Sequence, residues 1–293
     1  MRPLRLRARR PGFLDRPGRF ALGALLLALP LLLALLGPLL TGPPGPRQAA
    51  FTAPAGHLLG TDFAGQDVWR QVLLGGRSVV LIALAATVLC YALALPLAFA
   101  AALTHRTWLE ELLMRPLDVL LAVPSLLMVL LVATVFDPGA VGLAVLVALV
   151  NVPDAARIVR ASAAEAAARP AVEALRMQGE GWCRIALGYV ARCCLRTLAA
   201  DAGVRMTGVL YLVATAAFLG VGVAPDAADW AVMVDRNRTG LFVQPWAVVV
   251  PALLIVGLSM GTNLLGDAGL AGRNRAAARP RTTPRPRTTK GQP

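Results

Sequence analysis

Charged residues are scarce in this chain. Asp, Glu, Lys and Arg together make up 15% of its 293 residues, whereas hydrophobic residues make up 57% and the mean hydropathy is +0.65. Soluble domains carry about 25% charged residues, so this shortage excludes an ordinary soluble protein of the same length. Long apolar segments separated by short polar stretches predict a polytopic membrane protein instead.

The residues that most enzymes and metal sites require are also few. Lys290, in the C-terminal tail, is the single lysine of the sequence, so there is no GxxxxGK[ST] loop and no ATP binding by that route. The two histidines fall in different loops, and the four cysteines show no CxxC or Cys/His spacing. No Ser/His/Asp set or carboxylate pair is evident either. We therefore expect no cofactor, no metal site and no enzymatic activity in this chain.

Six apolar segments approach the roughly 20 residues that a bilayer core requires. The fourth is the weakest, because Asn151, Pro153 and Asp154 end its apolar run, and it spans only if its helix continues toward Arg157. A re-entrant segment is the alternative there. The sequence thus predicts an all-α polytopic fold with six transmembrane helices. The predicted spans are Phe20–Leu40, Val79–Leu103, Leu117–Phe136, Gly139–Val152, Gly203–Val223 and Trp246–Leu265.

The basic residues predict the orientation of these spans. Most of the arginines lie in the N-terminal stretch, in the segment 153–201 and in the C-terminal tail. The positive-inside rule therefore places both termini and residues 153–201 in the cytoplasm. There the arginines meet anionic lipid, so we do not interpret the net charge of +13 as a sign of nucleic-acid binding.

Ionisable residues deep inside the predicted spans are scarce. Asp118, Asp154, Asp201, Arg205 and Asp267 all fall near predicted span ends. Ion-coupled carriers keep charged groups near mid-membrane because such groups are costly there and serve transport. If the protein moves a solute, the sequence indicates that the energy comes from a partner.

The stretch "PAVEALRMQGEGWCRIAL" is a polar break between the fourth and fifth spans. Proline suits a first helical position, and glycine suits a helix end, so we expect one short helix from Pro170 to about Gly179. A second short helix would carry Trp182 and Ile185. A surface hairpin that merely links two spans is the alternative.

Two further stretches have a distinctive residue order. "HLLGTDFAGQDVWRQVLLGGRSVVL" precedes the second span, and its glycines Gly60 and Gly65 allow tight turns. Asp62 and Asp67 are candidate helix caps. "AFLGVGVAPDAADWAVMV" follows the fifth span and "PWAVVVPALLIVGLSMGTNLLGDAGL" forms the sixth. Their tryptophans suit a membrane interface.

These three regions together resemble the permease subunits of binding-protein-dependent ABC importers, in the dipeptide/oligopeptide/nickel branch. The resemblance covers about residues 57–270. In the loop motif, the matching positions are Pro170, Glu173, Ala174, Leu175, Gly179, Arg184 and Ile185. Before the second span they are His57, Gly60, Thr61, Asp62, Gly65, Asp67 and Arg77. Around the last two spans they are Phe218, Gly220, Gly222, Trp230, Pro245, Trp246, Asn263, Gly266 and Asp267.

The resemblance implies a function and a set of partners. It implies a bacterial cell-membrane permease that forms half of a solute pathway and pairs with a second permease chain. ATPase subunits would grip the short loop helix, and an extracytoplasmic binding protein would deliver peptide, nickel, opine or another solute. The chain departs from the family pattern at Leu175, at Ala191-Arg192 in place of Leu-Pro, and at Val213 in place of a Glu.

Composition, the predicted spans and the resemblance together divide the chain. We expect a basic tail (1–19), an anchor span (20–40), an extracytoplasmic loop (41–77), a permease domain (78–267) with a coupling loop at 160–200, and a disordered Arg/Pro/Thr-rich tail (268–293). The alternatives are a secondary carrier or channel that needs no ATPase, a transport-inactive homologue, and a membrane enzyme.

Overall fold

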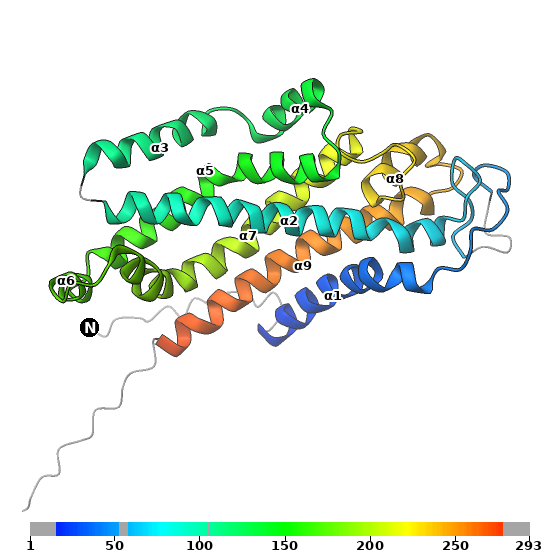
Figure 1. Cartoon of the computed structure of the whole chain (residues 1–293). Helices are drawn as coiled ribbons and strands as arrows, with labels where there is room; N and C mark the ends of the chain where they lie inside the picture. The colour runs from blue at the N-terminus through cyan, green and yellow to red at the C-terminus, as the bar shows by residue number, and fades with distance from the viewer. Residues whose placement is uncertain (1–15, 53–57, 105, 278–293) are drawn as a thin grey trace, which may run out of the picture.

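Long helices form one bundle in the computed structural model, which describes residues 16–52, 58–104 and 106–277 (Figure 1). Five helices are long and apolar enough to cross a membrane, and one bent pair brings the total to as many as six within this part of the chain. The predicted all-α polytopic fold is therefore confirmed. The five long helices are α1 (Arg16–Leu40), α2 (Val68–Leu103), α5 (Ala140–Ala167), α7 (Ala191–Phe218) and α9 (Trp246–Ala277).

The fourth predicted span is a continuous helix. α5 runs past Asn151 and Pro153 without a break, and the Asn151 side chain donates a hydrogen bond to the Val147 carbonyl (2.8 Å). The side-chain amide of Asn151 is thereby hydrogen-bonded within its own helix. α5 packs extensively against α2 at the centre of the bundle, so the re-entrant alternative is wrong.

The third predicted span, by contrast, is broken. α3 (Thr107–Leu121) and α4 (Ser125–Phe136) meet at 88°, whereas the sequence predicts one span over Leu117–Phe136. The break precedes Pro124, and a residue that precedes proline is disfavoured in the helical region. Both helices lie along the side of the bundle next to α5 (Figure 1).

Two ion pairs tie α3 to α5. The Arg157 guanidinium contacts the Asp118 carboxylate (2.6 Å), and Arg160 contacts Glu110. All four side chains are partly exposed, so each pair contributes little to stability. The two pairs show that α3 turns the face that carries Glu110 and Asp118 toward the bundle.

Some helix ends differ from the predicted boundaries. α2 begins at Val68, so residues 68–77 are helical and not part of the preceding loop. α7 ends at Phe218, five residues before the predicted end, and α9 continues to Ala277. The predicted N-terminal tail lies largely, and the disordered C-terminal tail partly, outside the described residues. Two short helices, α8 (Trp230–Asn237) and η2 (Arg238–Gly240), precede α9.

Candidate functional site

A short helix caps one end of the bundle between α5 and α7 (Figure 1). This helix, α6, spans Pro170–Met177 with its proline in the first turn. Gly179 follows with φ +79°, and the N–H groups of Gly179 and Glu180 donate to the carbonyls of Arg176 (3.0 Å) and Leu175 (3.1 Å). This pair of bonds is a Schellman motif, in which glycine takes the left-handed position. The predicted helix and its glycine stop are confirmed.

The chain then returns directly into α7. Helix resumes at Trp182, passes through the π-helical turn η1 (Arg184–Val190) and continues as α7. The predicted second short helix is therefore wrong, because the residues after Trp182 form the first part of one long helix. No proline interrupts this stretch. We call α6 and the following residues 178–185 the α6 hairpin.

The α6 hairpin has a buried side and an exposed side. Val172 and Ile185 are buried, at 0% and 4% exposed, and Leu175 packs partly buried beside them. These side chains belong to a hydrophobic cluster that we call the hairpin cluster. Its buried members are Ala98, Phe99, Leu103, Val159, Ala163, Ala166, Val172, Ile185, Ala186, Val190 and Cys194.

The exposed side of the hairpin mixes apolar and charged groups. Met177 and Trp182 are 79% and 48% exposed. Arg184 is exposed and pairs with Glu180 (3.1 Å). Large apolar side chains rimmed by charge typify a protein-contact surface. The other motif positions on this side are Pro170, Glu173 and Gly179, with Ala174 half-buried.

The motif before the second span lies at the opposite end of the bundle. Thr61 is fully buried, accepts the N–H of Thr52 (2.9 Å) and donates to the Ala49 carbonyl (2.8 Å). Gly60 and Gly65 have φ +71° and +72°, as their predicted turns require. His57 lies outside the described residues, and Arg77 is exposed on α2.

The two aspartates of this motif have different roles. Asp67 caps α2 by accepting the N–H of Trp69 (3.0 Å), as predicted. Asp62 caps no helix; its Oδ1 accepts the N–H groups of Ala64 (2.9 Å) and Gln66 (2.7 Å) inside the loop. Burial raises the pKa of the Asp62 carboxyl above its ordinary value, although these two bonds lower it.

Two residues without a sequence signal attach this loop to the bundle. The side-chain oxygen Oδ1 of Asn237 accepts the N–H of Phe63 (3.0 Å), and the side-chain amide of Gln244 donates to the Leu59 carbonyl. Asn237 and Gln244 are 1% and 2% exposed. Their buried amides hold the first loop against α8 and the start of α9.

Thr61 gives a direct test of this loop. We expect Thr61→Val to destabilise the folded protein by about 1–3 kcal/mol, because it removes the buried hydroxyl that accepts the N–H of Thr52 and donates to the Ala49 carbonyl. The thermal unfolding midpoint in detergent measures this. Thr61→Ser keeps the hydroxyl and is the matched control; equal midpoints for the two variants would contradict the assignment.

Trp230 lies inside the protein and not at a membrane interface. It is 0% exposed, its indole N–H donates to the Val72 carbonyl (2.8 Å), and its ring lies against Gly76 of α2. A Cβ at Gly76 would come within 2.3 Å of that ring. The predicted interface position is therefore wrong for Trp230, whereas Trp246 is 47% exposed.

The remaining motif residues shape the turns and contacts around α7 and α9. Gly220 and Gly222 follow Phe218 with φ +81° and +79°, which supports the predicted bend. Gly266 of α9 lies against Gly203 of α7, where a Cβ at Gly203 would be 3.0 Å from the Gly266 Cα. Pro245 directly precedes α9. Asp267 lies inside α9 and does not follow the helix as predicted.

A groove runs between α7 and α9. Its volume is about 710 Å³, and its lining combines apolar side chains with hydroxyl groups, as do contacts between transmembrane helices. Asn263 of the last-span motif lies on its wall. The lining residues are Thr207, Tyr211, Ala214, Thr215, Phe218, Ala231, Val234, Ala252, Ile255, Val256, Ser259, Met260, Asn263 and Leu264.

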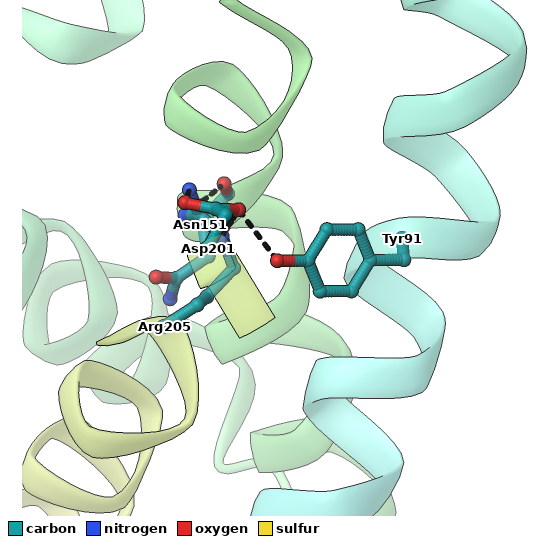
Figure 2. Close-up of polar contacts among 4 residues, drawn as sticks. All are labelled: Tyr91, Asn151, Asp201 and Arg205. Carbon is teal, nitrogen blue, oxygen red and sulfur yellow. Dashed lines mark hydrogen bonds and ion pairs between the residues drawn. The ribbon is translucent and has the colours of Figure 1, made fainter. Parts of the chain in front are cut away.

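A buried polar cluster joins three of the long helices (Figure 2). Arg205 binds Asp201 through two contacts of 2.9 Å, and it donates to the Asn151 carbonyl (3.2 Å). Tyr91 of α2 points at the pair and donates to Asp201 (2.5 Å). The Arg205 and Asp201 side chains are 5% and 7% exposed. We call these four residues the polar cluster.

The helix that carries this cluster begins earlier than the sequence predicts. Asp201 lies at the midpoint of the helix Arg184–Phe218, whereas the predicted span begins at Gly203. The helix extends far toward the α6 hairpin, so Asp201 and Arg205 lie well inside it. The signal that could have found them is their i, i+4 spacing, which places opposite charges on one helix face.

These features define a class of protein: a multi-pass helical membrane protein that displays a short, exposed hairpin at one end. Residues 94–268 match the family described as the binding-protein-dependent transport system inner membrane component. The chain belongs to this family. It is thus an ABC importer permease, and the resemblance inferred from its three motifs is confirmed.

Several named proteins are similar to the chain along most of its length. A protein of Brucella suis provisionally described as a peptide transport system permease is 32% identical over 90% of this chain and 89% of its own length. The di/tripeptide transport system permease protein of Pseudomonas aeruginosa is 30% identical over 73% and 70% of the two chains. The dipeptide transport system permease protein of Haemophilus influenzae is 26% identical over 72% and 71%.

Proposed function

We propose that this chain forms half of the solute pathway of an ATP-driven importer and is moved by a separate ATPase chain. A second, different permease chain supplies the other half of the pathway. Both termini and the α6 hairpin face the cytoplasm. This orientation agrees with the concentration of arginine in the N-terminal stretch, the segment 153–201 and the C-terminal tail.

The observation that carries this proposal is the construction of the α6 hairpin. Its exposed side offers Met177 and Trp182 to a partner. Its buried side is fixed by Val172 and Ile185 to the ends of α2, α5 and α7. A force applied to α6 by an ATPase would therefore act on three long helices at once.

The substrate is a peptide that an extracytoplasmic binding protein delivers at the loop end, where α8 and the residues around Thr61 lie. Support for peptide comes from the names of the relatives, several of which refer to peptide, dipeptide or tripeptide transport. The sequence departures do not argue for an inactive homologue. Leu175 packs against the hairpin cluster and Val213 is buried in the bundle, so both substitutions fit their surroundings.

The proposal is tested by isolating the protein with its partners. Tagged chain is purified from membranes in mild detergent, and its companions are identified by mass spectrometry. We expect a P-loop ATPase and a second permease, with the ATPase lost when Glu173 is replaced by Lys and Gly179 by Val. Recovery of this chain alone, still moving solute into liposomes without ATP, would establish a secondary carrier instead.

A further inference from the structure

Most buried apolar residues in the described part of the chain fall into two separate clusters. The hairpin cluster occupies the end that carries α6. The second, which we call the main cluster, fills the rest of the bundle between α1, α2, α4, α5, α7, α8 and α9. On α2 the main cluster ends at Ala94 and the hairpin cluster begins at Ala98, and on α5 the corresponding residues are Ala156 and Val159.

The two clusters are furthest apart along α7. The hairpin cluster ends at Cys194 and the main cluster begins at Val209. Between them, Leu198 packs partly buried against the hairpin cluster and Met206 against the main cluster. In the stretch 199–205, all of which the structure describes, no apolar residue is buried, whereas the Asp201 and Arg205 side chains are 7% and 5% exposed. A charged pair thus occupies the place in which a continuous bundle would have apolar residues.

Arg205 and Asp201 connect the three helices that cross this boundary. Arg205 reaches the Asn151 carbonyl on α5, and Asp201 accepts the hydroxyl of Tyr91 on α2. The pair itself belongs to α7 (Figure 2). Every helix that continues from the main cluster into the hairpin cluster is therefore held at one polar point.

The same level of the bundle contains backbone features that weaken helices. Pro96 lies on α2 between the last residue of the main cluster and the first of the hairpin cluster. Pro153 lies on α5 two residues beyond Asn151. Proline removes a backbone hydrogen bond and bends a helix. The π-helical turn η1 adds a third irregularity, on the hairpin side of α7.

Stability alone does not account for a buried ion pair at this place. A buried pair costs so much desolvation that apolar residues of similar volume often stabilise a fold equally well. Buried charges within membrane spans usually serve a function. A pair that fixes the relative position of three helices, beside two prolines, suits a joint between two packed units.

We propose that Asp201 and Arg205 are positioning residues of a joint about which the hairpin unit pivots relative to the main bundle during transport. The hairpin unit comprises α6, the ends of α2 and α5, and the start of α7 as far as Cys194. The polar cluster keeps the three helices in register while the unit tilts. The link to transport rests on the proposed function, whereas the joint itself is a property of this chain alone.

The first experiment measures the joint in the purified permease without any ATPase. Spin labels are attached to Cys183, which is exposed on the hairpin, and to Phe242→Cys at the loop end, where the native side chain is 98% exposed. The other native cysteines are replaced. We expect a narrow distribution of label-to-label distances, and a clearly broader one after Asp201→Leu with Arg205→Met. An unchanged distribution would overturn the proposal.

Three further variants separate a joint from general damage. Tyr91→Phe removes only the hydroxyl that contacts Asp201, so it should broaden the distribution even if the double variant does not fold. Asn151→Ala keeps the backbone carbonyl that Arg205 uses, and it should leave the distribution narrow. Arg205→Lys keeps the charge but loses the bidentate contact with Asp201, so the distance distribution should have an intermediate width. Broadening by Asn151→Ala but not by Tyr91→Phe would contradict the joint.

The second experiment uses the assembled transporter. We expect the double variant to lower the ratio of binding-protein-stimulated to basal ATP hydrolysis about 10-fold, within the usual range of coupling between sites, with normal amounts of complex. A wild-type ratio would overturn the role in transport. If no ATPase associates with the wild-type chain, the proposed function fails, and the distance measurement still decides whether the joint exists.

Discussion

Replacing Gly179 with valine is expected to reduce ATP-driven uptake about 10-fold while the amount of chain in the membrane stays unchanged. Gly179 has φ +79°, and an ordinary residue in that left-handed conformation costs about 1–2 kcal/mol, where 1.4 kcal/mol is a factor of ten. The strain is relieved by giving up the Schellman bonds to Leu175 and Arg176, which turns the end of α6. Uptake into proteoliposomes, set against the quantity of inserted protein, measures the effect.

Gly181→Val is the matched control for this substitution. Gly181 is exposed, it is not among the glycines with positive φ, and a Cβ there would meet nothing within 4 Å. It should therefore transport normally. The space around Gly179 is equally open, so any difference between the two variants reports backbone conformation and not a clash. Normal uptake by Gly179→Val would mean that the geometry of α6 does not matter for transport.

Trp230→Ala is expected to destabilise the folded protein by about 3–5 kcal/mol, the usual cost of removing a large buried aromatic side chain. The substitution empties the space over Gly75 and Gly76 of α2 and leaves the Val72 carbonyl without the indole N–H. We expect a large fall in the thermal unfolding midpoint and less chain recovered from membranes.

Trp246→Ala serves for comparison, because Trp246 belongs to the same sequence motif but is 47% exposed. Its unfolding midpoint should change far less than that of Trp230→Ala. If the two tryptophan variants lost similar stability, the packing of Trp230 between α8 and α2 would not be the source of its effect.

The sequence predicted the helical fold well but misjudged where helices break. α5 was the weakest predicted span, yet it is continuous, because Pro153 and Asn151 are tolerated within a helix packed along α2. The third predicted span carried no sign of a break, yet the chain bends by 88° just before Pro124. Prolines also lie inside α1, α2, α3 and α9, so proline alone does not indicate which helix breaks; packing decides.

The motifs predicted local backbone geometry better than they predicted side-chain environment. Gly60, Gly65, Gly179 and Asp67 adopt the turns, the helix stop and the cap expected of them. The burial of Trp230 was not foreseen, because tryptophan at the end of a span suits an interface as well as a core. It depends on two glycines of another helix, far away in the sequence.

The polar cluster could be predicted only in part. The i, i+4 spacing of Asp201 and Arg205 indicates that the two can pair. Their burial depends on where α7 begins, and that depends on how the α6 hairpin returns to the bundle. Tyr91 and the Asn151 carbonyl come from α2 and α5, and no local pattern marks them as partners.

Cross-linking from Cys183 tests most directly whether an ATPase grips the α6 hairpin. A variant that keeps Cys183 as its single cysteine is treated in membranes with a short thiol-to-amine reagent, and the products are identified by mass spectrometry. Phe242→Cys in a chain without other cysteines is the control at the opposite end of the bundle. We predict that Cys183 is joined to a P-loop ATPase subunit and that the thiol of the control variant is not. No ATPase product from Cys183, or equal products from both positions, would contradict the account.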